Sequence, residues 1–86
     1  MSEISGFYGI RITINFRDHQ PPHFHAEYGD DEVLIVIRTG DVYQGGLPRR
    51  ALRMVQEWTA LHRDELLALW DLAQAKSPLR TTAPLD

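Results

Sequence analysis

The segment from Asp18 to Glu27 gathers the side chains best suited to chemistry. It holds three of the four histidines of the chain, next to two prolines and two carboxylates. In an extended strand His23, His25 and Glu27 point to the same side, with about 6–7 Å between successive Cα atoms, so their side chains can reach one ion. The preceding loop folds Asp18 and His19 back toward the same end of the strand.

Two imidazoles and one carboxylate form a ligand set that suits non-haem iron and, together with water, zinc. The candidate cofactor is therefore a divalent transition metal such as zinc or iron, and its candidate ligands are His23, His25, Glu27, His19 and Asp18. The same imidazoles suit metal-free acid–base catalysis, for which the candidate catalytic residues are His19, His23 and His25. A third interpretation is structural, because loops that enter strands often use Asp, His and Pro to satisfy backbone groups.

A second candidate site consists of the basic residues Arg49, Arg50 and Arg53. Cations at the start of a helix oppose its macrodipole, so helix stability does not explain this cluster. Arginine side chains suit the phosphates of nucleic acid, other anions or an acidic protein partner. The alternative is salt bridging within the domain, for which Arg53 and Glu57 have the spacing of one helical turn.

Length and composition limit the class of protein. A chain of 86 residues forms one domain with one small core. It has no cysteine, so any metal must use histidine and carboxylate ligands, and its net charge of −3 gives no overall basic field for nucleic acid. The sequence has neither an apolar run of about 18 residues nor a signal-peptide pattern, so we expect a cytoplasmic protein without membrane contact. No nucleotide-binding glycine motif is present, which argues against a nucleotide cofactor.

Hydrophobic periodicity predicts a sheet in the first half of the chain. Apolar residues alternate with other residues from Tyr8 to Phe16 and again from His23 to Tyr28, which is typical of half-buried strands. The continuous apolar run from Val33 to Ile37 predicts a central strand, and a shorter strand follows around 42–44. We therefore expect a four-stranded antiparallel meander.

An apolar stripe with a period of 3.6 residues predicts helical structure over residues 49–76. One helix of that length would span about 42 Å, too long for so small a domain, so we expect a break at Asp64-Glu65 and two helices over 48–62 and 64–76. His62 lies on the stripe as a half-buried packing residue. Trp70 lies at its edge, which predicts an exposed apolar patch and hence a protein partner or a homodimer.

The predicted fold is α+β, with the meander followed by two C-terminal helices packed on one face of the sheet. The domain covers residues 1–76, and residues 77–86 are expected to form a loosely ordered tail.

Four motifs together resemble a widespread family of small bacterial proteins, the domain of unknown function number 4160. The resemblance covers nearly the whole chain, from roughly Ser5 to Ala75. The family often carries a third proline where this chain has Gln20. The motifs that carry the resemblance are Phe7-Tyr8-Gly9-Ile10, Asp18-His19-x-Pro21-Pro22-His23-Phe24-His25-Ala26-Glu27-Tyr28-Gly29, Leu47-Pro48-x-x-Ala51-Leu52 and Trp58-x-x-x-His62.

The resemblance implies partners rather than catalytic residues, because the family has no established biochemical activity. Its members are often encoded beside another small domain, in pairs that look like toxin–antitoxin modules, which implies a small protein partner encoded nearby and nucleic acid as a further partner. Three hypotheses follow. The chain is a toxin–antitoxin-like component with a His-rich metal site, a small metal-independent nuclease that combines the histidines with the arginine cluster, or a structural or interaction module without catalysis.

Overall fold

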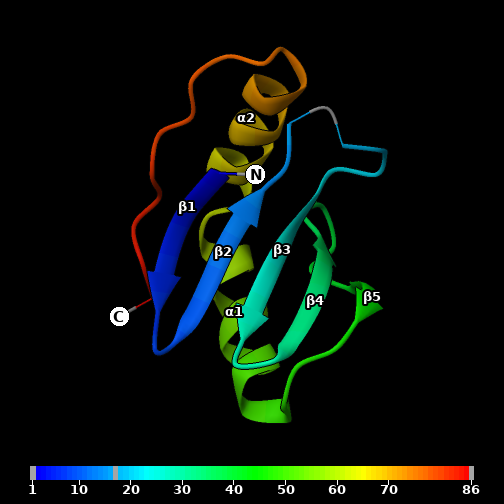
Figure 1. Cartoon of the computed structure of the whole chain (residues 1–86), viewed down its shortest axis with the longest axis vertical. Helices are drawn as coiled ribbons and strands as arrows, with labels where there is room; N and C mark the ends of the chain where they lie inside the picture. The colour runs from blue at the N-terminus through cyan, green and yellow to red at the C-terminus, as the bar shows by residue number, and fades with distance from the viewer. Residues whose placement is uncertain (1, 17, 86) are drawn as a thin grey trace.

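Five antiparallel strands and two helices form two layers in the computed structural model, which describes residues 2–16 and 18–85 (Figure 1). The sheet has the order β1-β2-β3-β4-β5, and both helices cover the same face of it. The α+β class predicted from the sequence is confirmed. No helix in this described part of the chain is long and apolar enough to span a bilayer. The elements are β1 (Ser2–Phe7), β2 (Ile10–Ile14), β3 (His23–Tyr28), β4 (Asp31–Val36), β5 (Val42–Gly45), α1 (Arg49–Leu61) and α2 (Arg63–Gln74).

The prediction of four strands is wrong, because β1 adds a fifth strand at the edge of the sheet. Tyr8 and Gly9, expected at the start of a strand, instead form the turn between β1 and β2, with φ angles of 50° and 81°. The two ends of this hairpin, Phe7 and Ile10, are paired directly. A register shift between Glu3 and Ser5 interrupts the alternation of β1, so its sequence lacks the regular pattern of a strand.

The core lies between the sheet and the helices. Ile12, Ala26 and Val33 are cross-strand neighbours on β2, β3 and β4, and all three are fully buried. Trp58 of α1 packs against the sheet residues Phe7 and Phe24, with ring centroids 5.4 and 5.5 Å away. The helices bury further apolar side chains in this layer, namely Ala51, Val55, Leu66, Leu69, Trp70 and Ala73.

The prediction of two helices is confirmed, but the break falls at His62 and not at Asp64-Glu65, which lie within the first turn of α2. The backbone N–H of His62 bonds to the carbonyls of Trp58 and Thr59, and its ring lies half-buried, 5.4 Å from the ring of Trp58. Trp70 departs from the prediction, since it is only 2% exposed and contributes no exposed patch. The reason is that Trp70 belongs to the core cluster and packs on the ring of His23, with ring centroids 5.3 Å apart.

Residues 77–85 run back along β1, as the orange and red trace in Figure 1 shows. The Thr82 N–H bonds to the Ile4 carbonyl, and the Trp58 indole N–H donates to the Ala83 carbonyl at 2.9 Å. Leu79 packs on the core. The sequence predicts a loose tail for residues 77–86. The composition of this segment does not indicate the contacts that it makes with β1 and the core.

Gly45 at the end of β5 provides a sharp test of the strand pairing. Its φ is +77°, and a Cβ at this position would collide with the backbone carbonyl of Glu32. We expect Gly45→Ala to lower the free energy of unfolding by about 2–4 kcal/mol, because a left-handed backbone and a steric clash both oppose the new methyl group. Gly46→Ala is the matched control, since a Cβ there meets nothing within 4 Å. Equal urea midpoints for the two variants would contradict this packing.

Candidate metal centre

In the folded chain the carboxylate of Asp18 lies against the rings of His23 and His25. Its Oδ2 atom is 3.1 Å from Nε2 of His23 and 3.3 Å from Nε2 of His25. One ligand atom from each of these three residues lies within 4.8 Å of the other two. The structure thus brings together three of the five residues that the sequence suggests as metal ligands.

Strand β3 and the loop before it position these three side chains. His25 is the cross-strand neighbour of Thr13 and Leu34, so it lies on the sheet face that carries neither Phe24 nor Ala26. His23 lies two residues earlier and therefore shares this face. The loop brings Asp18 over the two rings, and the bond from Gln74 to its carbonyl ties the loop to α2.

The outer nitrogens of both rings face oxygens that accept hydrogen bonds. Nδ1 of His23 lies 2.8 Å from the Pro21 carbonyl, and Nδ1 of His25 lies 3.3 Å from Oε2 of Glu32. A carbonyl or an ionised carboxylate only accepts, so each Nδ1 carries the proton and donates it. Histidines that bind metals typically donate their second N–H to such an oxygen, which fixes the ring and leaves Nε2 free as the ligand.

The distances from the two Nε2 atoms to Oδ2 of Asp18 are compatible with a shared ion. With metal–ligand bonds of about 2.0–2.1 Å, neighbouring ligand atoms are separated by about 3.0 Å in an octahedral site and about 3.4 Å in a tetrahedral one. The observed separations of 3.1 and 3.3 Å fall in this range. Asn15 Nδ2 lies 3.1 Å from Nε2 of His25, which fits a proton on Nδ1 of this ring, and a metal at Nε2 would have to replace this hydrogen bond.

Without a cation the same contacts need more protons. His23 could bond to both the Pro21 carbonyl and the Asp18 carboxylate only if both of its nitrogens carried hydrogen. His23 is only 1% exposed, and a buried charge is costly. A divalent ion between Nε2 and Oδ2 satisfies the same atoms with neutral rings.

The ring of His23 is enclosed by other rings. The centroids of His19, Trp70 and Tyr43 lie 5.0, 5.3 and 5.8 Å from it. The side chain of His19 is itself 60% exposed, and the Tyr43 residue is 44% exposed. The site is therefore closed around His23 and open toward solvent on the side of His19.

The pKa of Asp18 suits a metal ligand. Burial raises this pKa, but the hydrogen bond from the His19 backbone N–H, the contact with His25 and the electrostatic effect of the neighbouring His23 and His19 rings lower it by more in sum. The net pKa lies below the ordinary value of an aspartate. The Asp18 carboxylate is therefore ionised at neutral pH, as a ligand must be.

Glu27 and His19 lie outside the group of three. Glu27 is four residues from His23, which is about 13 Å along a strand. Its Oε1 atom lies 3.5 Å from Nη1 of Arg11. Nε of the same arginine lies 2.9 Å from Oε1 of Glu3. Nε2 of His19 lies 3.7 Å from the other carboxylate oxygen of Asp18. Asp18, rather than Glu27, supplies the carboxylate that faces both histidines.

Several residues around the site escaped the sequence analysis. Glu32 could have been found from the register of the β3–β4 hairpin, which pairs it with Glu27. Asn15 follows the last residue of β2 on the side that Thr13 shares with His25. Trp70 and Gln74 belong to α2, and no local pattern connects them with the His-rich segment.

The arginine cluster forms a separate surface. Arg49, Arg50 and Arg53 are exposed on the first turns of α1, and within residues 2–16 and 18–85 none has a carboxylate within the 4.0 Å of an ion pair. The proposed bridge from Arg53 to Glu57 is therefore absent from this part of the chain. Helix α1 begins at the opposite end of the sheet from the first residue of β3 (Figure 1). The arginine cluster and the histidines therefore lie toward different ends of the sheet.

Comparison with known families shows which family the chain belongs to. The sequence profile of one family, Domain of unknown function (DUF4160), matches residues 9–71, which is more than half of the chain. The chain belongs to this family. The matched region of the DUF4160 chain includes Asp18, His23 and His25, and it confirms the resemblance seen in the sequence at the level of the family. No curated protein and no solved structure matches the chain.

Proposed function

We propose that this DUF4160 protein binds a divalent transition metal, zinc or iron(II), through Oδ2 of Asp18 and Nε2 of His23 and His25. One observation carries the proposal. Both Nε2 atoms converge on one carboxylate oxygen while each Nδ1 faces an accepting oxygen. Histidines that bind metals typically have this arrangement, with one ring nitrogen at the ion and the other donating to an oxygen.

The proposed centre leaves room for a further ligand. Two histidines and one carboxylate fill three positions, so water or a substrate can take the remaining ones. A bound metal polarises such a ligand. His19, exposed beside Asp18, is placed to exchange protons at the open side of the site.

We also infer a small protein partner encoded nearby, as in toxin–antitoxin-like pairs, and a cytoplasmic location. The support for the partner is the family resemblance, together with large side chains that remain exposed in the fold, such as Leu61 at 67% and Val42 at 42%. If a neighbouring gene product is the partner, the two proteins should co-purify as one species after co-expression. Separate elution of the two chains from a sizing column would contradict it.

Titration of the untagged protein with zinc, iron(II) and nickel tests the metal proposal. Calorimetry should show one ion per wild-type chain. The His23→Ala/His25→Ala variant should bind the ion more than about 100-fold more weakly, because loss of a residue that only hydrogen-bonds to a metal ligand already weakens metal affinity by about 10–100-fold. His62→Ala is the matched control, because His62 lies at the helix junction and pairs with Glu65. Affinity that survives the double substitution would refute the site.

A further inference from the structure

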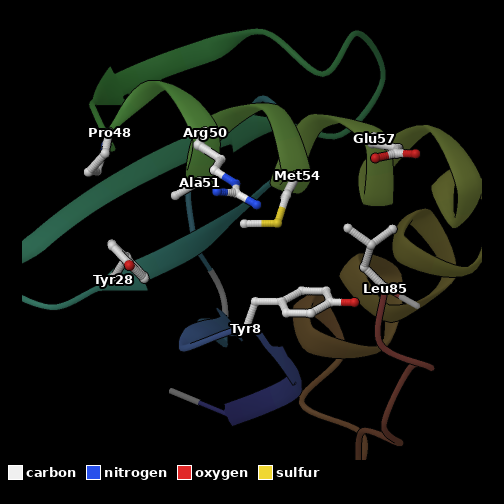
Figure 2. A pocket seen from close by; sticks show the side chains of 8 residues that line it. All are labelled: Tyr8, Tyr28, Pro48, Arg50, Ala51, Met54, Glu57 and Leu85. Carbon is white, nitrogen blue, oxygen red and sulfur yellow. The ribbon is translucent and has the colours of Figure 1, made fainter.

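A cavity of about 530 Å³ lies between the β1–β2 turn and α1, away from the metal centre (Figure 2). Tyr8 and Tyr28 line it from the sheet, and Arg50 and Met54 line it from the helix. Its volume is in the range of pockets that bind small organic ligands. None of its lining residues takes part in the metal centre.

Tyr8 has a conformation that its packing does not explain. Both central residues of the β1–β2 turn have positive φ, an arrangement that favours Asn or Gly at the first of the two positions. A bulky aromatic residue there is an outlier, and the side chain remains 60% exposed, so burial offsets little of the cost. Strained residues of this kind concentrate at functional sites. Figure 2 shows the ring of Tyr8 lying along the cavity.

The second aromatic wall lies beside the same turn. A Cβ on Gly9 would meet the ring of Tyr28 at 3.4 Å, an ordinary van der Waals distance, so this ring lies close to the turn. Tyr28 is 39% exposed. The cavity therefore presents two accessible aromatic rings that the hydrophobic core does not use.

The charge of the cavity is uneven. Figure 2 shows Arg50 and Met54 reaching from α1 over the ring of Tyr8. Arg50 has no carboxylate within ion-pair distance in the described ranges 2–16 and 18–85, and the exposed Arg49 and Arg53 lie on the same turns. Glu57 lines the cavity further along the helix. A ligand with a flat ring and an anionic group at the Arg50 end matches this pattern.

We propose that the cavity binds a nucleotide unit, with its base stacked on Tyr8 and its phosphate bound by Arg50. A base stacks on tyrosine whatever its sequence, and arginine binds phosphate through two parallel hydrogen bonds. The unit is either a free nucleoside monophosphate or one nucleotide of a single strand. The site goes beyond metal binding and uses none of the residues of the metal centre.

Fluorescence anisotropy with short fluorescein-labelled single strands of RNA and DNA tests the proposal at low salt. Arg50→Ala and Tyr8→Asn should each weaken binding about tenfold or more, because each removes one of the two contacts. Tyr8→Phe keeps the ring and should keep the affinity. Asn tolerates the left-handed turn, so Tyr8→Asn should melt no earlier than wild type, which separates lost binding from lost folding.

Two control variants sharpen the result. Arg80→Ala removes the same charge from the exposed C-terminal segment and should change binding little. Glu57→Gln removes the opposing charge from the cavity and should strengthen binding. Equal loss in Arg80→Ala and Arg50→Ala would overturn the proposal, because the interaction would then depend on total charge alone.

Competition distinguishes the two sources of the nucleotide. Displacement of the labelled strand by adenosine or uridine monophosphate would show that the single unit suffices, and strand binding without such displacement would assign the cavity to the polymer. Absence of binding by both strands and monophosphates would overturn the proposal. Binding of an acidic peptide with an aromatic side chain in their place would also overturn it and would assign the cavity to a protein partner.

Discussion

Zinc at about 100 times its dissociation constant should raise the free energy of unfolding of the wild-type protein by about 2.7 kcal/mol, and Asp18→Asn should abolish most of this gain. For a domain of this size the gain corresponds to a rise of about 10–20 °C in melting temperature. The physical reason is that Oδ2 of Asp18 is the atom on which both histidines converge, and an amide oxygen lacks its charge. Differential scanning calorimetry with and without zinc measures both values.

Glu27→Gln is the control for this experiment. It removes a carboxylate from the same strand as the histidines, but Glu27 pairs with Arg11 and lies outside the ligand group. Zinc should therefore stabilise Glu27→Gln as strongly as wild type. If zinc stabilised Asp18→Asn but no longer stabilised Glu27→Gln, the metal ligands would be His23, His25 and Glu27, as the alternation along the strand suggests.

Trp58→Ala should lower the free energy of unfolding by about 3–5 kcal/mol, a large part of the total stability of a small domain. Trp58 is fully buried, contacts Phe7 and Phe24, and donates its indole N–H to the Ala83 carbonyl. The substitution therefore removes the largest fully buried side chain of the core and one hydrogen bond to the C-terminal segment. Urea denaturation followed by circular dichroism measures the change.

Two further variants locate this effect in the core. Trp58→Phe keeps a ring and loses the hydrogen bond, so its cost should lie between those of wild type and Trp58→Ala. Leu61→Ala removes an apolar side chain that is 67% exposed and should change stability by no more than about 0.5 kcal/mol. Similar losses in Trp58→Ala and Leu61→Ala would contradict the packing of α1 on the sheet.

The sheet and the helices could be predicted wherever the hydrophobic period is regular. Ile10, Ile12 and Ile14 alternate strictly and are all buried, and the length of the helical stretch required the break that occurs at His62. Strand β1 was missed because it contains Ser and Gly and because its register shifts between Glu3 and Ser5. Its pairing depends on the turn at Tyr8-Gly9, which resembles the start of the next strand in the sequence.

The candidate site could be predicted only as far as local spacing extends. Alternation along β3 places His23 and His25 on one face, as the sequence suggests. Glu27 follows the same alternation, but the strand carries it too far along the sheet, while the loop returns Asp18 to the two rings. Trp70 completes the surroundings of His23 through the packing of α2, which no local pattern encodes.

Anomalous diffraction at the zinc absorption edge, from crystals of the untagged protein grown with zinc, tests the proposed metal centre most directly. We predict one peak per chain, at about 2.0–2.2 Å from Oδ2 of Asp18 and from Nε2 of His23 and His25. A peak bound instead at His19 or His62, or no peak beside Asp18 at saturating zinc, would contradict the proposed metal centre.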